Sequence, residues 1–111
     1  MLLFRGSDVY QPGRSPEAIQ ALKQKLIHWI SDLSEKGMHV ASEPLEPTGK
    51  QVRGTKKSVA DGPFGMAREI IGGCTIVQAK DINEAVEIAK SCPILASNAN
   101  IEVRPIQIME I

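Results

Sequence analysis

Apolar side chains recur at helical spacing in the first third of the chain. Ser15 precedes Pro16, the usual order of an N-cap residue and a proline at the first helical position. Gly37 favours the end of a helix after the last apolar position. The pattern therefore predicts a helix over about residues 16–36. Its apolar stripe consists of Ile19, Leu22, Leu26, Trp29, Ile30 and Leu33.

A second apolar stripe follows Asp81, which forms a capping-box pattern with Glu84. Pro93 cannot continue a helix and marks its end. A second helix is therefore expected between Asp81 and Pro93. Its buried positions are Ile82, Ala85, Val86 and Ala89.

The remaining apolar runs predict strands. They cover residues 1–4, 38–47, 68–79 and 101–111. Two short polar segments, "KQVRG" and "KKSVADG", flank Gly54-Thr55 and are typical of a small hairpin. The order of elements predicts one α+β domain over residues 1–111, with two helices on one face of an antiparallel sheet.

The other face of this sheet is unusually poor in charge. An antiparallel sheet with one wet face alternates apolar and polar residues, whereas "CTIVQA" and "MHVASE" carry little charge on either face. We therefore expect a second subunit to cover this face, giving a homodimer through the sheet. The alternative is a weakly polar face that stays exposed.

Composition limits the classes of partner. Thirteen basic and thirteen acidic side chains cancel, so charge gives no reason to expect binding to nucleic acid or to an anionic membrane. No apolar run approaches the roughly 20 residues that span a bilayer. Two cysteines are too few for a disulfide framework or a zinc site. A cytoplasmic protein without metal or cofactor is expected.

Three segments, "VADGPFGMARE", "IIGGCTIVQAKDINEAVEIAKSCP" and "IEVRPI", closely resemble the DGPF branch of the YCII-related family, as does the first helix, "SPEAIQALKQKLIHWISDLSEKG". The resemblance covers nearly the whole chain. It implies a ferredoxin-like βαββαβ domain, here with an inserted hairpin, that pairs into a dimeric α/β barrel. The family is mostly uncharacterised: some relatives look enzyme-like, and some are linked or fused to sigma factors.

The DGPF stretch itself has two compatible interpretations. Gly62 and Pro63 favour a turn, which the Asp61 side chain can stabilise by hydrogen bonds to the backbone. Phe64 would then pack in apolar surroundings and anchor the turn. Alternatively, Asp61 and the turn amides line a pocket at the mouth of the barrel, as loops on a rigid scaffold often do.

Two departures from the family weaken a catalytic interpretation. The branch often has a pattern like DGPFxExKE, in which Arg68 and Glu69 match but Met66 replaces the first acid. Relatives of the shorter branch place a His on the first helix near an Asp, as a candidate acid–base pair. Counted back from Gly37, this position is Leu26, while His28 lies about opposite the apolar stripe and is expected on the surface.

Other polar residues are candidates for the cavity. Alternation along residues 38–43 predicts that His39 faces away from Met38 and Val40, into the dimer cavity. Alternation along the closing strand likewise predicts that Glu102 and Arg104 face away from the helices. Arg104 could bind an anion bidentately, or form a salt bridge with Glu102 or Asp61.

Arg53 is expected to be a solvated hairpin charge, although relatives often have a VR pair there. Trp29 is expected in the core, with a place at the cavity or a subunit contact as the alternative. Cys74 and Cys92 are expected to be unreactive. Gly72-Gly73 leads into a strand, so it predicts a β-bulge or a close backbone approach at the dimer seam rather than a phosphate loop.

Two classes of function remain open. The first is a non-catalytic homodimer that binds a small molecule or a protein in a regulatory setting. The second is an enzyme acting on a small acidic or aromatic metabolite by lyase, isomerase or oxygenase-like chemistry, with Asp61 as base, His39 as acid and Arg104 as anchor. A structural partner of a sigma factor is a third interpretation. Hydrogen-bond contact between Asp61 and His39 in one pocket would favour the enzyme.

Overall fold

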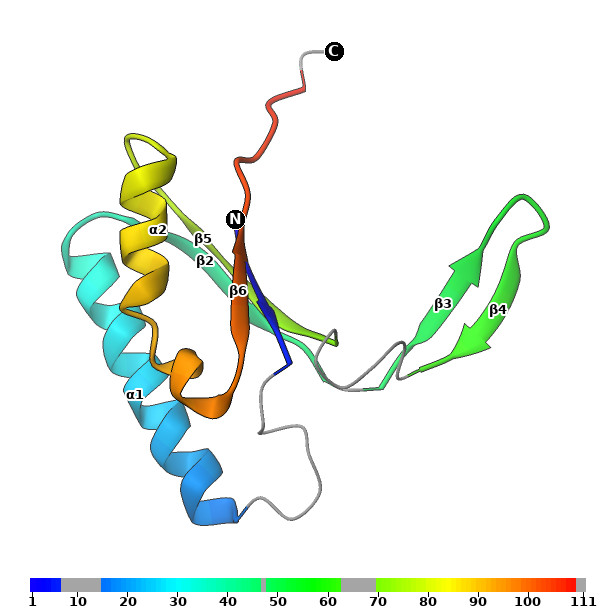
Figure 1. The fold of residues 1–111 in the computed structure, drawn as a ribbon, viewed down its shortest axis with the longest axis horizontal. Coiled ribbons are helices and arrows are strands. Elements are labelled where there is room, and N and C mark those ends of the chain that lie inside the picture. Colours follow the sequence, from blue (N-terminus) through cyan, green and yellow to red (C-terminus); the bar gives the residue numbers. More distant parts are fainter. Residues whose placement is uncertain (7–14, 47, 63–69, 110–111) are drawn as a thin grey trace.

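The structure is a computed structural model that describes residues 1–6, 15–46, 48–62 and 70–109 (Figure 1). Its elements in chain order are β1 (Leu2–Arg5), α1 (Pro16–Glu35), β2 (His39–Pro44), β3 (Lys50–Arg53), β4 (Ser58–Asp61), β5 (Ile71–Val77), α2 (Ile82–Lys90), a 3₁₀-helix η3 (Pro93–Ser97) and β6 (Asn100–Val103). This order confirms the predicted α+β fold.

Four strands form one antiparallel sheet in the order β2-β5-β1-β6, and β3 pairs only with β4. Both long helices lie on one face of the four-stranded sheet (Figure 1). Without the hairpin, the chain has the βαββαβ order and strand arrangement of a ferredoxin-like domain. The predicted pairing of two such sheets into a dimeric barrel remains a prediction.

The predicted helix ends are confirmed. The Ser15 hydroxyl accepts a hydrogen bond from the Ala18 amide at 3.1 Å, and Gly37 has a φ of +71° just after α1. At α2, the Asp81 carboxylate accepts from the Glu84 amide at 2.8 Å. Glu84 in turn accepts from the Lys80 amide at 3.0 Å, one residue before the expected position.

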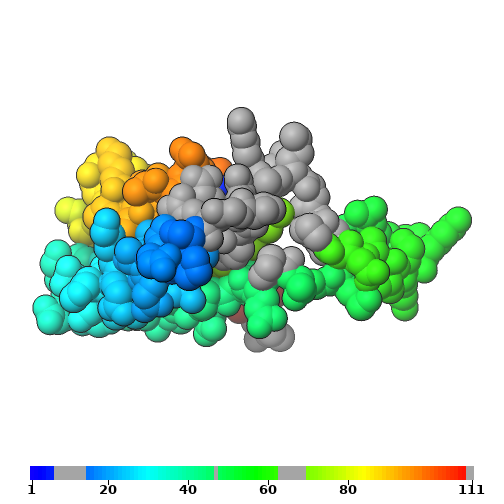
Figure 2. Space-filling model, turned by 90° about the horizontal axis from the view of Figure 1, so that it is seen from below, coloured from blue at the N-terminus to red at the C-terminus, as the bar shows by residue number. Residues whose placement is uncertain are grey.

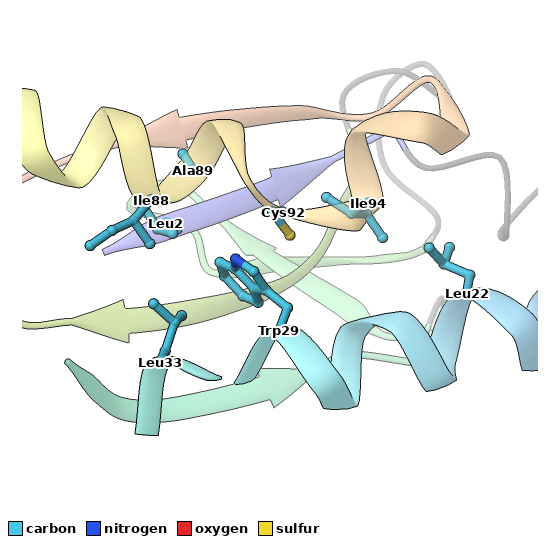
Figure 3. Packing of buried hydrophobic residues seen from close by; sticks show 8 residues of the cluster. All are labelled: Leu2, Leu22, Trp29, Leu33, Ile88, Ala89, Cys92 and Ile94. Atoms are coloured by element: carbon cyan, nitrogen blue, oxygen red, sulfur yellow. The ribbon is translucent and has the colours of Figure 1, made fainter. Parts of the chain in front are cut away.

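The core lies where α1 and α2 meet the sheet, and Trp29 occupies its centre (Figure 3). Its buried apolar members are Leu2, Leu22, Trp29, Leu33, Ile88, Ala89, Cys92 and Ile94. Leu2 is fully buried, in agreement with the central position of β1 in the sheet. The ring of Phe4 packs edge-on against Trp29 at a centroid distance of 6.4 Å.

Three features differ from the sequence prediction. Ile82 was expected among the buried residues of the second helix, but it is 46% exposed, and Ile88 is buried there instead. The closing strand ends at Val103 instead of continuing to residue 111, because Pro105 has no amide hydrogen for the sheet. Ile106 and Ile108, which follow it, are exposed. The third difference is η3, a helical turn that begins at Pro93, where the sequence predicted only a helix end.

The hairpin β3–β4 projects from the body as a separate arm (Figures 1 and 2). Val52 pairs with Val59 across it, and both side chains are more than 60% exposed. An isolated two-stranded hairpin is at best marginally stable in water. The arm therefore lacks an apolar partner within the part of the chain that the structure describes. No helix among the described residues is long and apolar enough to cross a membrane.

Candidate ligand-binding site

The two long helices differ in length, and this difference leaves part of α1 uncovered. Twenty residues give α1 a length of about 30 Å, whereas the nine residues of α2 span about 14 Å. The Trp29 and Leu33 half of α1 packs with α2 residues in the core cluster. Beside the other half, Ile94 of η3 supplies the covering side chain near Leu22 (Figure 3).

A cavity of about 330 Å³ lies between this half of α1 and strands β2 and β5. This volume is at the small end of the range for ligand pockets. Its walls are almost wholly apolar. The apolar side chains that form them include Ile19, Leu22, Leu26, Ile27, Trp29 and Ile30 from α1, Phe4 from β1 and Ile94 from η3.

Two glycines of β5, Gly72 and Gly73, lie at the floor of the cavity. Gly73 pairs with Phe4 on one side and Pro44 on the other. A Cβ atom at Gly73 would lie 2.8 Å from the Glu43 carbonyl oxygen. Gly72 is the extra residue where the β1–β5 register shifts. The predicted bulge and close approach are thus confirmed within one chain, while their place at a dimer seam remains a prediction.

A chain of three polar side chains lies at the edge of the floor. The Nε2 atom of His39 is 2.9 Å from the Ser42 hydroxyl, which is 2.9 Å from the Thr75 hydroxyl. Thr75 is 1% exposed and Ser42 is half-buried, and both line the cavity. Each of the three polar groups thus has a hydrogen-bond partner, as buried polar groups in proteins generally do.

The expected orientation of His39 is wrong. His39 pairs with Val77, and its bond to Ser42 places it on the helix-bearing face of the sheet. The cause is an irregularity between His39 and Ala41, where one extra residue, Val40, interrupts the alternation. Val40 is instead 51% exposed.

Asp61 lies at the end of β4, on the hairpin arm. Its carboxylate accepts a bond from the Lys50 ammonium at 2.5 Å, and its side chain is 80% exposed. The adjacent amide of Gly62 donates to the Gly49 carbonyl at 2.8 Å. Within one chain, Asp61 and His39 thus bond to different partners on different elements. Pro63 and Phe64, like Met66, Arg68 and Glu69, lie outside the described residues.

The predicted salt bridge of Arg104 to Glu102 is confirmed at 3.7 Å, and Arg5 contacts the same carboxylate at 3.4 Å. Arg104 also borders a second, more polar hollow of about 470 Å³ with Ile76 and Ile106. Arg53 is exposed and donates to the Gln51 side chain at 2.5 Å, as a solvated hairpin charge would.

The predicted core position of Trp29 is confirmed at 7% exposure, although its ring also borders the cavity. His28 is exposed, as expected. Burial raises the pKa of the Cys92 thiol to about 11, while a backbone hydrogen bond from Ile94 opposes this rise. The rise in pKa agrees with an unreactive thiol, and its main cause is desolvation by burial. Cys74 is only partly buried.

Sequence reasoning missed Ser42 and Thr75 as site residues, and it missed the cavity itself. The available signals were the unequal lengths of the two helices and the paired glycines in β5. Among the described residues, no cluster of three metal-binding side chains occurs.

Comparison with protein-family models gives a match to the YCII-related domain over residues 6–110. A comparison with curated proteins finds no matching relative. The family match spans almost the whole chain and agrees with the βαββαβ arrangement around the inserted hairpin. The chain therefore belongs to the YCII-related family.

Proposed function

We propose that this protein is a homodimeric, non-catalytic module that binds a compact apolar molecule in the cavity beneath α1. The observation that carries this proposal is the cavity itself, which combines a volume of about 330 Å³ with an apolar lining and a narrow polar edge. Small-molecule sites commonly have this composition. The site thus lies beneath α1 rather than at the DGPF turn.

A binding role is favoured over an enzyme because the proposed catalytic pair is separated within one chain. Asp61 is an exposed partner of Lys50, and His39 bonds to Ser42. A general base must lie within hydrogen-bond reach of the proton it takes. Neither Asp61 nor His39 lines the cavity.

Two exposed apolar regions support the homodimer. The helix-free face of the sheet carries Leu3, Cys74 and Ile76, which are only partly buried in one chain. The hairpin arm adds Val52 and Val59. Apolar surface that one chain leaves open to solvent is commonly an interaction site. A second copy of the chain would cover both regions.

A thermal-shift screen tests ligand binding. The panel contains small aromatic and branched aliphatic compounds, and the proteins are the wild type, Leu26→Trp and Leu95→Trp. Leu26 lines the cavity, so the larger ring fills it; Leu95 is exposed, does not line it and serves as the matched control. A ligand at 100 times its Kd stabilises the fold by about 2.7 kcal/mol, a rise of several degrees in Tm.

The proposal predicts at least one compound that raises the Tm of the wild type and of Leu95→Trp but not of Leu26→Trp. Absence of any stabilising compound, or an equal response in Leu26→Trp, would contradict a site beneath α1.

A further inference from the structure

The cavity opens along one flank of α1. Leu22, Trp29 and Leu33 are the buried residues of this helix and lie within about 40° of one another around its axis. Lys23, Ile27 and Ile30, which also line the cavity, lie about 80–140° from Leu22 on a single side. Ile27 is 58% exposed. The mouth of the cavity is therefore on the flank of α1 that carries Lys23.

One cation stands at this mouth. The charged residues that line the cavity are Lys23 and Glu43. Glu43 pairs with Cys74 and alternates with Ser42, so its carboxylate belongs to the helix-free face of the sheet. Its backbone carbonyl is the atom that approaches Gly73. Among the described lining residues, Lys23 thus supplies the charge at the entrance.

The floor does not favour a charged group. Ser42 and Thr75 already bond to each other, and Ser42 bonds to His39. The rest of the lining is apolar, where an ionised group would lose its hydration without gaining partners. An amphipathic ligand would therefore place its apolar end inside and its charge at the mouth.

We propose that the ligand is a compact apolar monoanion, with a ring or branched chain in the cavity and a carboxylate beside the Lys23 ammonium. This inference rests on the proposed binding function and specifies the chemical class of its ligand. A single flexible ammonium suits a single carboxylate, because Lys acts as a compact point charge.

The probes are 3-phenylpropionate and its neutral isostere 3-phenylpropanamide. Trp29 is the only tryptophan of the chain and borders the cavity, so its fluorescence reports binding at this site. Both probes are titrated into the wild type, Lys23→Gln and Lys25→Gln. Lys25 is exposed on the same helix and does not line the cavity, so it is the matched control.

The wild type and Lys25→Gln should bind the acid about two- to fivefold more tightly than the amide, as expected for an exposed ion pair. Lys23→Gln should bind both probes equally, and about 0.5 M salt should reduce the preference of the wild type. Equal binding of acid and amide to the wild type, or a preference that survives in Lys23→Gln, would overturn the monoanion while leaving the site intact. If neither probe changes Trp29 fluorescence while another compound of the thermal-shift panel raises the Tm, the monoanion is overturned and the site stands. If no compound of the panel raises the Tm either, both proposals fail.

Discussion

The Trp29 indole donates a hydrogen bond to the Ser91 hydroxyl at 2.9 Å, joining the middle of α1 to the end of α2. Ser91 in turn donates to the Ile88 carbonyl at 2.6 Å. The bond fixes the ring that forms both the centre of the core and one wall of the cavity (Figure 3). The packing of the two helices and the shape of the site therefore depend on one another.

Ser91→Ala should lower the free energy of unfolding by about 1 kcal/mol, because the Trp29 indole loses a part-buried hydrogen bond. Urea denaturation followed by circular dichroism measures this change. Ser31→Ala, an exposed substitution on α1, should stay within about 0.5 kcal/mol of the wild type. Equal stability of the two variants would show that the bond to Trp29 contributes nothing.

Gly73→Ala should destabilise the fold by about 1–3 kcal/mol, since its methyl group would meet the Glu43 carbonyl at 2.8 Å. Gly49→Ala is the control, because a Cβ there meets nothing within 4 Å. Thermal unfolding of both variants tests the comparison. A Gly73→Ala protein as stable as Gly49→Ala would argue against the close approach of β2 and β5.

Val52→Lys with Val59→Lys should dissociate the homodimer while leaving the unfolding of each chain nearly unchanged, because both side chains are exposed within one chain. Sedimentation velocity over a concentration series measures the effect. Gln51→Lys adds charge to the opposite face of the same arm, and its dimer should persist. A wild type that stays monomeric at high concentration would contradict the homodimer.

Stability should fall between pH 9 and pH 11 because of Cys92. Burial raises the pKa of its thiol from 9.0 to about 11, so the unfolded chain releases this proton first and the free energy of unfolding decreases as pH rises. The loss is on the order of 2 kcal/mol by pH 11. Urea titrations should show a weaker pH slope in Cys92→Ala than in Cys74→Ala. Equal slopes would exclude this contribution.

The element order was predictable because each element carries its own local signal. Ser15 and Asp81 cap their helices as predicted, and Gly54 lies in the predicted hairpin turn. Local signals failed where the pairing of two strands decides which face a side chain lies on. The extra residue at Val40 reversed the expected orientation of His39, and no periodicity argument reveals such an insertion.

The candidate site was less predictable, since it depends on how helices and strands far apart in the sequence pack together. Lys23 and Ser42 lie on separate elements and line one cavity only in the folded chain, where α1 packs over β2 and β5. Asp61 was prominent in the sequence because of its family motif, yet its described contact is with Lys50 on the arm.

The central claim is that the site lies beneath α1, and amide chemical-shift mapping tests it most directly. ¹⁵N-labelled protein is titrated with a compound that raises its Tm. We predict perturbations at the Trp29 indole and at the amides of Ser42, Gly73 and Thr75, which surround the cavity. Perturbations confined to Arg53 and Asp61 on the hairpin would contradict the claim and return the site to the DGPF turn.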